Sequence, residues 1–319
     1  MKILITGASG CVGRYLVEAL LANPDHRLVL AVREAAKLDV LSDADRARVE
    51  IVECDLTELA ARPEAFDGVE AGVLVATAWG GGDTYDITVG ANLAIADALI
   101  AAGARHVLYF ATASVLDQQG GLLQAADTFG TDYIRAKFQL VQQMETRADR
   151  ARITGLYPTL VMGGRTAAPA IRMSHFANLM HEIRPYAWAL RFISANGLFN
   201  IVHAADIATV TRHLIETVTD TTGNARLVLG NPAGSVDEMM AQFAHANGRR
   251  QRTILRLRTS WVDTLTRVLP INLSPWDRFC VDHPDQSHPA AVNPATYGLP
   301  VVMPDLVSGL ASIGISGRG

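Results

Sequence analysis

The first thirteen residues constrain the fold more than any other stretch of the chain. A short apolar run, residues 1–6, is followed by glycines at 7, 10 and 13 and then by an apolar-periodic stretch from Tyr15 to Leu21. This order predicts a strand, a tight turn and a helix. Gly7 allows the turn, Gly10 leaves room for a pyrophosphate near the backbone, and Gly13 lets helix and strand pack closely. The helix N-terminus then offers N–H groups to phosphates. The predicted phosphate-binding residues are Gly7, Ser9, Gly10, Cys11, Val12 and Gly13.

Apolar runs typical of strands recur through the first half of the chain and alternate with helical periodicity. The expected strands are residues 27–32, 49–53, 72–76, 106–111 and 152–157, and the two long expected helices are Tyr85 to Ala102 and Asp132 to Arg147. This alternation predicts an α/β fold with a doubly wound parallel sheet, the Rossmann type. Ligands of such sheets bind beyond the carboxyl ends of the strands.

The alternation fades after residue 160, where prolines and glycines interrupt the pattern. We expect residues 1–160 to form the dinucleotide-binding core and residues 161–319 to form mainly a smaller C-terminal region that caps the substrate. Within it, an expected strand at 199–203 and a helix from Asp206 to Val218 predict that residues 199–218 return to the core.

Composition excludes several classes of protein. A formal charge of −4 in 319 residues gives no basic surface for nucleic acid, and no apolar run is long enough to span a membrane. The chain begins without a signal-peptide pattern, so a cytoplasmic location is expected. The scattered cysteines, Cys11, Cys54 and Cys280, indicate reduced thiols, and no metal site is predicted.

A tyrosine and a lysine at a spacing of four residues form the candidate catalytic pair. Tyr133 and Lys137 share one face of the expected helix, so the ammonium group can favour the phenolate and can also bind a nicotinamide ribose. The chain contains only three lysines, which makes a lysine at this position informative. An arginine would not provide the same compact, tunable charge.

The cofactor preference is predicted from the end of the second expected strand. NAD enzymes usually carry an acidic residue there to hold the ribose 2′-hydroxyl, whereas this chain has Arg33. An arginine can pair with the 2′-phosphate of NADP. We therefore expect NADP, while Glu34, the next residue, keeps NAD possible, and Arg33 as a solvated loop charge stays an alternative.

Together, the N-terminal Thr6-Gly7-x-x-Gly10-x-x-Gly13 pattern and the Tyr133-x-x-x-Lys137 pair resemble the extended short-chain dehydrogenase/reductase family, which includes nucleotide-sugar epimerases, dehydratases and dihydroflavonol reductases. The resemblance covers about residues 1–220. It implies that Thr112 is the catalytic hydroxyl, with Ser114 as its competitor. The further cofactor-binding residues that it implies are Asp55, Leu56, Ala76, Thr77, Ala78 and Pro158. Asp55 would meet the adenine amino group, although it can equally serve as a helix N-cap.

Two departures from the family bear on the substrate. Tyr157 stands in place of the arginine of a Leu-Arg-Pro motif, and Leu198 or Phe199 replaces an arginine that many nucleotide-sugar enzymes use to neutralise a diphosphate. Aromatic side chains in the capping region instead suit an apolar substrate.

We therefore expect an NADP-dependent oxidoreductase acting on a carbonyl or hydroxyl of a non-nucleotide, fairly apolar small molecule by a Thr-Tyr-Lys mechanism. A nucleotide-sugar epimerase or dehydratase with resident NAD is the first alternative, and a catalytically idle NADP sensor is the second. A homodimer through the helices near Tyr85 and Asp132 is possible on the family resemblance.

Overall fold

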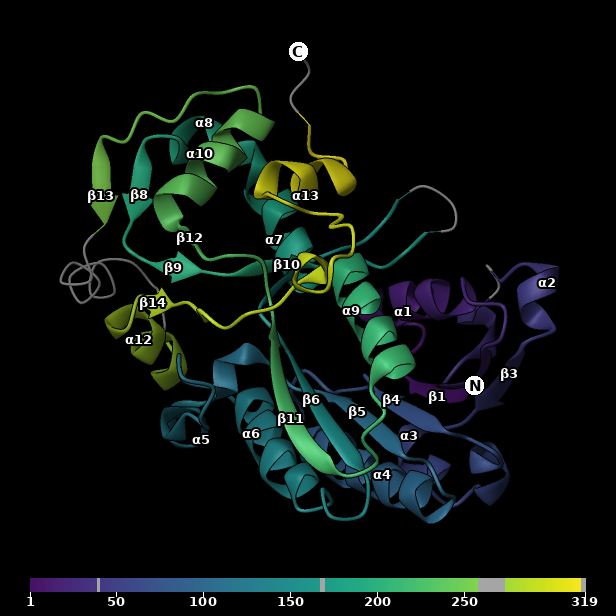
Figure 1. Cartoon of the computed structure of the whole chain (residues 1–319). Helices are drawn as coiled ribbons and strands as arrows, with labels where there is room; N and C mark the ends of the chain where they lie inside the picture. The colour runs from purple at the N-terminus through teal and green to yellow at the C-terminus, as the bar shows by residue number, and fades with distance from the viewer. Residues whose placement is uncertain (39–40, 167–169, 258–272, 317–319) are drawn as a thin grey trace.

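A seven-stranded parallel sheet forms the centre of the molecule (Figure 1). The computed structural model describes residues 1–38, 41–166, 170–257 and 273–316. In spatial order the strands of the sheet are β11 (Gly223–Leu229), β6 (Arg152–Pro158), β5 (His106–Phe110), β4 (Ala71–Leu74), β1 (Lys2–Thr6), β2 (Arg27–Val32) and β3 (Val49–Glu53). The predicted fold class, a doubly wound Rossmann sheet, is confirmed.

The strand order reverses between β1 and β4. From β1 the chain builds outward through β2 and β3, and then returns to place β4 on the other side of β1, with Ile3 paired to Ala71 and Thr6 to Leu74. In sheets of this kind the loops leave the carboxyl ends of two such strands in opposite directions, and ligands bind in the crevice between them. The glycine turn follows β1 directly, so it lies at this position.

Helices cover both faces of the sheet because its strands are apolar on both sides. In β1, Ile3 and Ile5 pack toward one face, with α1 (Cys11–Leu21) and α9 (Ala204–Thr217), while Leu4 packs toward the other. The second face carries α4 (Asn92–Ala101) and α6 (Asp132–Glu145) (Figure 1). Side chains alternate across a strand with a period of two, so one strand supplies both cores.

In the segment predicted at 199–218, the helix returns to the core as expected but the strand does not join the main sheet. Its helix, α9, does pack against α1 on the core. The expected strand at 199–203 is two short strands, β9 (Leu198–Phe199) and β10 (Ile201–His203), and neither joins the main sheet. The seventh strand of that sheet is β11, which pairs with β6 along its whole length and was not predicted.

The C-terminal region builds a separate small core on helices α7, α10 and α13, including Met162, Met180, Phe243, Met303 and Leu310. Its helices are α7 (His175–Ile183), α8 (Ala187–Leu190), α10 (Val236–Ala246), α12 (Pro275–Asp282) and α13 (Leu306–Ser312). Its remaining strands are β7 (Leu160–Met162), β8 (Ile193–Ala195), β12 (Gly234–Ser235), β13 (Leu255–Leu257) and β14 (Asp285–Gln286). Figure 1 shows this region above the carboxyl ends of the sheet.

Short elements complete the chain and connect the larger ones. They are η1 (Ala35–Leu38), α2 (Asp43–Arg46), α3 (Leu56–Leu59), η2 (Pro63–Phe66), η3 (Asp86–Ala91), η4 (Ala113–Val115), α5 (Gln124–Phe129), η5 (Arg184–Tyr186) and η6 (Pro294–Tyr297). Within the described ranges, no helix combines the length and apolar character that crossing a bilayer requires.

Candidate active site

The glycine turn after β1 forms a backbone cradle at the start of α1. Gly7 has a φ of +69°, and a Cβ there would lie 2.9 Å from the backbone nitrogen of Ala76. A Cβ at Gly13 would overlap the carbonyl oxygen of Gly7, so the helix can approach the strand only with glycine at this position. No side chain caps α1, whose N-cap is Gly10. The first-turn N–H groups are therefore not satisfied by a cap, and the cradle fits the pyrophosphate of a dinucleotide.

The segment after β4 is held in place beside this turn. The Thr6 hydroxyl accepts hydrogen bonds from the backbone nitrogens of Val75 and Ala76, at 3.1 and 3.3 Å. The Thr88 hydroxyl accepts one from the nitrogen of Ala78 at 3.2 Å. These bonds fix the predicted cofactor-contacting residues Ala76 to Ala78 next to the strand-order reversal.

A π-helical stretch supplies that support. Where one continuous helix was expected from Tyr85, η3 precedes α4, and the side-chain amide of Asn92 donates to the backbone oxygens of Ala76 and Thr88 at 3.2 and 3.1 Å. Asn92 is 1% exposed. Sequence reasoning missed both features, since a single π-turn leaves no periodic signal, although such turns are frequent near functional sites.

Lys137 connects the helix of the candidate pair to the end of β5. Its ammonium group donates to the backbone oxygen of Phe110 at 2.6 Å, and the side chain is 1% exposed. Burial lowers the pKa of Lys137 from 10.5 to about 7, because the charged form loses its hydration. The nitrogen lies 5.9 Å from the centre of the Tyr133 ring. The two side chains therefore share one site, as the spacing of four predicts.

Tyr133 is held in its protonated form by its surroundings. Burial raises its pKa well above the usual value of 10. Desolvation is the cause of this rise, and the expected lowering of the Tyr133 pKa by Lys137 stays a prediction for the cofactor-bound protein. At neutral pH the phenol is thus a proton donor.

Thr112 lies at the end of β5, two residues after the carbonyl that Lys137 binds. Its hydroxyl accepts from the backbone nitrogen of Ser114 at 3.4 Å and caps the short helix η4, and it lies 3.3 Å from the Ser114 hydroxyl. The two candidate hydroxyls therefore occupy one turn. Both are partly exposed, so either can reach a ligand.

An aromatic contact that sequence reasoning missed covers Tyr133. The indole of Trp79 stacks on the phenol ring with centroids 4.5 Å apart and an interplanar angle of 12°. His175, at the start of α7, lies 4.1 Å from the indole. No sequence pattern pairs a loop residue with a helix residue 54 positions away, so this contact could not be predicted.

Arg33 and Asp55 follow the adjacent strands β2 and β3 and are both exposed. Within the described residues Arg33 forms no hydrogen bond or ion pair. Hydrogen bonds from Lys37 and Thr57 lower the pKa of Glu34 and of Asp55, and the charge of Arg33 adds to both shifts. Glu34 pairs with Lys37 at 2.6 Å. Asp55 caps α3 by accepting from the Thr57 hydroxyl and backbone nitrogen at 2.7 and 3.0 Å, which lower its pKa. The structure thus shows Asp55 as the N-cap of α3. The contact of Asp55 with adenine stays a prediction, and so does the cofactor contact of Leu56, the first residue of α3.

Tyr157 takes part in a buried polar cluster and not in an open site. Its hydroxyl lies 2.9 Å from that of Tyr109, and both rings are almost completely buried. Beside them Arg226 forms a bidentate ion pair with Glu145, at 2.6 and 2.8 Å. A residue at position 157 therefore faces the core, while Pro158 ends β6 at the ligand-binding edge.

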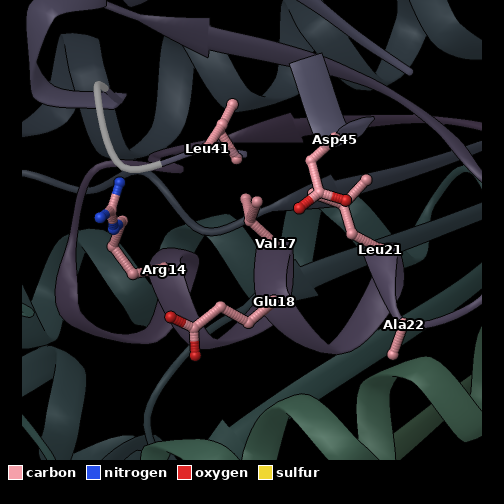
Figure 2. Close-up of a pocket in the computed structure, with 7 residues that line it drawn as sticks. All are labelled: Arg14, Val17, Glu18, Leu21, Ala22, Leu41 and Asp45. Carbon is pink, nitrogen blue, oxygen red and sulfur yellow. The ribbon is translucent and has the colours of Figure 1, made fainter. Parts of the chain in front are cut away.

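A surface cavity of about 280 Å³ lies beside α1, and neither Tyr133 nor Lys137 lines it (Figure 2). Its lining residues are Arg14, Val17, Glu18, Leu21, Ala22, Leu41 and Asp45. None is a predicted site residue, so the cavity does not define the catalytic centre. Across the described ranges, no group of three or more His, Cys, Asp or Glu side chains could hold a metal ion.

Comparison with known families assigns the segment that contains the glycine turn and the candidate catalytic residues. Residues 7–166 match a family described as NAD(P)H-binding, a match that covers half of the chain and includes every predicted site residue. The chain belongs to this NAD(P)H-binding family. A search of curated proteins finds no match to this chain.

Solved structures share the fold of this NAD(P)H-binding protein. MoeE5 in complex with UDP-glucuronic acid and NAD has a TM-score of 0.67 at 20% identity, covering 98% of this chain and 97% of MoeE5. Gox2253 also has 0.67, at 17% identity, with 90% and 89% covered. Yeast methylglyoxal/isovaleraldehyde reductase Gre2 complexed with NADPH has 0.59 at 13% identity, with 76% and 81% covered. These likenesses confirm the predicted Rossmann fold.

Proposed function

We propose that this protein is an NADP-dependent reductase of aldehydes or ketones, with a non-nucleotide, apolar substrate. The observation that carries the proposal is the pair on α6, in which a protonated, partly buried Tyr133 lies one turn from the buried Lys137, itself bonded to the end of β5. A phenol held in its acid form suits the donation of a proton to a carbonyl oxygen.

The residues have separate roles in this reaction. Bound nicotinamide supplies the hydride at C4. Tyr133 gives its proton to the carbonyl oxygen, and the Thr112 hydroxyl donates a hydrogen bond to the same oxygen. Lys137 holds the nicotinamide ribose and, once charged, favours the phenolate that remains. Its attachment to Phe110 keeps the ammonium group fixed between the helix and the strand end.

The NADP preference rests on the charges at the end of β2. Arg33 is exposed and forms no hydrogen bond or ion pair within the described residues, so its guanidinium is available to a 2′-phosphate. The adjacent carboxylate, Glu34, is already paired with Lys37. NAD enzymes usually carry the carboxylate for the ribose 2′-hydroxyl at the position where this chain has Arg33.

A second candidate function is nucleotide-sugar conversion with resident NAD. It is favoured by the likeness to MoeE5, which extends over nearly all of both chains. The buried Tyr157 and the aliphatic and aromatic side chains of Leu198 and Phe199 count against it, since none of them neutralises a diphosphate.

One set of measurements separates the two. The purified protein is first analysed for bound nucleotide, then titrated calorimetrically with NADPH and NADH, and finally assayed with NADPH against aliphatic and aryl aldehydes and ketones. Arrival without nucleotide, at least tenfold tighter binding of NADPH and turnover of a carbonyl support the reductase. Co-purification of NAD that does not exchange, with turnover of a UDP-sugar, overturns it in favour of the second candidate.

A further inference from the structure

The ring of Tyr133 is oriented by packing and not by a bond to its hydroxyl. Within the described residues no hydrogen bond holds that hydroxyl, and burial is the one cause of its raised pKa. The ammonium group of Lys137 comes only to within 5.9 Å of the ring centre. The plane of the phenol, which decides where the hydroxyl lies, therefore depends on the groups that pack against the ring.

The indole of Trp79 provides the ring contact that defines this plane. It lies 4.5 Å from the centre of the Tyr133 ring and almost parallel to it, at 12°. Aromatic pairs are stable only in a few geometries, so this stacking resists tilting of the phenol. The indole also covers one face of the phenol, and a carbonyl can reach the hydroxyl only from another side of the ring.

His175 holds the indole in turn. The imidazole lies 4.1 Å from the indole, at an angle of 53°. It belongs to the first residue of α7, whose N-cap, Ser174, donates to the Val161 oxygen at 2.6 Å and accepts from the Ala177 nitrogen at 3.1 Å. These bonds attach the start of α7 to β7. The indole thus contacts a ring fixed in the C-terminal region and the phenol on α6.

This arrangement is not a by-product of core packing. Trp79 is 61% exposed, so most of its apolar surface gains nothing from burial. Its two ring contacts are with the proposed proton donor and with the C-terminal region.

We propose that Trp79 is a positioning residue for Tyr133: held by His175, its indole fixes the plane of the phenol, covers one face of the ring and leaves the hydroxyl to meet the substrate. The inference rests on the proposed role of Tyr133 as proton donor, and it assigns no substrate contact to Trp79. Proton transfer requires hydrogen-bond geometry between the phenol and the carbonyl oxygen. A displacement of about 1 Å at a reacting group can lower the rate about 100-fold, so loss of the indole should lower kcat through Tyr133.

The kinetic test uses wild type, Trp79→Ala, Trp79→Phe and the control Trp188→Ala. Trp188 lies on α8 and is also exposed, at 59%. With NADPH, kcat is measured for benzaldehyde and for butanal. Trp79→Ala is expected to lower kcat about 10- to 100-fold, by the same factor for both substrates. Trp79→Phe, which keeps a ring to stack, should restore most of the activity, and Trp188→Ala should match wild type. A loss confined to benzaldehyde would mean that the indole contacts the substrate, and would overturn the proposal.

A double-mutant cycle tests whether Trp79 acts through Tyr133. In the Tyr133→Phe background no hydroxyl remains to be positioned, so adding Trp79→Ala should lower kcat by less than about twofold. General destabilisation of the site would instead lower the residual activity by the full factor. The full loss in this background would therefore refute the positioning role.

An ionisation measurement separates failure of this inference from failure of the proposed function. The ultraviolet absorbance of tyrosinate is followed from about pH 8 to 11, and the signal of Tyr133 is the difference between each protein and its Tyr133→Phe counterpart. Lys137 on α6 and His175 on α7 are the titratable groups that contact the phenol and the indole. Both occur in each pair of proteins, so their effects on the other tyrosines cancel.

In wild type, Tyr133 should stay protonated over this range, because burial raises its pKa. In Trp79→Ala, water reaches the uncovered face, and the pKa should fall toward its usual value of 10. If wild type reduces no carbonyl but Trp79→Ala shows this ionisation, the reductase proposal fails and the role of Trp79 stands. If carbonyls are reduced and neither kcat nor the ionisation of Tyr133 responds to Trp79→Ala, the positioning role is wrong and the reductase stands.

Discussion

Lys137 and Phe110 are joined by a hydrogen bond of 2.6 Å from the ammonium group to the backbone oxygen at the end of β5. This bond attaches α6 to the strand that carries Thr112, and so sets the position of the proposed proton donor relative to the proposed hydroxyl. It also retains a lysine in a site from which water is nearly excluded. A partner that is a neutral carbonyl does not cancel the cost of a buried charge, which is why the pKa of this lysine falls.

The stability of the protein should depend on pH through Lys137. Its folded pKa of about 7 lies below the unfolded value of 10.5, so the unfolded chain binds this proton more tightly. Below about pH 7 the charged Lys137 lowers the free energy of unfolding by its full amount. This destabilisation disappears as the pH rises from about 7 to 10.5. The free energy of unfolding of Lys137→Met, relative to wild type, should therefore fall between pH 7 and 10, by up to about 1.4 kcal/mol per pH unit. Urea titrations at several pH values measure it. The exposed Lys37→Met is the control, and identical pH profiles for Lys137→Met and wild type would refute the assignment.

Tyr133→Phe should abolish turnover without affecting the cofactor. Removal of a general acid costs a factor of about 10²–10⁴ in kcat. The ring and its stacking on Trp79 are kept, so the Kd for NADPH should stay within about twofold of wild type. Steady-state kinetics and calorimetry measure the two quantities. Tyr186→Phe, which removes an exposed hydroxyl from the C-terminal region, should change neither. Wild-type kcat in Tyr133→Phe would exclude it as the proton donor.

The neighbouring hydroxyls of Thr112 and Ser114 can be ranked by substitution. We expect Thr112→Val to lower kcat/KM about 10²-fold, by removing a hydrogen bond to the developing oxyanion, and Ser114→Ala to lower it less than fivefold. Thr112 also caps η4, so the melting temperature of both variants is measured to separate catalysis from stability. The reverse order of the two losses would assign the catalytic hydroxyl to Ser114.

Arg33→Ala should weaken NADPH binding and leave NADH binding unchanged. Loss of a charge-assisted contact to the 2′-phosphate corresponds to about 1.5–3 kcal/mol, or roughly 10- to 150-fold in Kd. Arg27, exposed at the opposite end of the same strand, provides the matched control as Arg27→Ala. Fluorescence titration with both nucleotides measures the ratio. An equal loss for NADPH and NADH in Arg33→Ala would remove the basis for NADP preference.

The core was predictable because its signals are local, while much of the site depends on contacts between distant segments. The strand at 27–32 was predicted to the residue, since a parallel strand buried on both faces is a continuous apolar run. The edge strand at 49–53 was also predicted to the residue, although two exposed glutamates interrupt its apolar residues. The spacing of Tyr133 and Lys137 is a helical property and was read correctly. β11 was missed although it follows the predicted helix α9 after a short loop. The burial that raises the pKa of Tyr133 was missed because it depends on packing that the sequence does not display.

The glycine at position 13 provides the sharpest test of the cofactor cradle. A Cβ at this position would overlap the Gly7 oxygen and the Ala8 Cα, both backbone atoms that cannot rotate away. In Gly13→Ala the N-terminus of α1 must therefore move off β1, which displaces the N–H groups at the phosphate position. We expect a loss of about 2 kcal/mol or more in stability, as for other overpacked sites, and at least a hundredfold weaker binding of NADPH. Gly90→Ala is the matched control, because a Cβ there meets only the Tyr85 oxygen, at 4.0 Å, and alanine favours helix. Thermal unfolding and calorimetry of both variants decide the point: NADPH binding retained in a destabilised Gly13→Ala would mean that the cofactor does not depend on the close approach of α1 to β1.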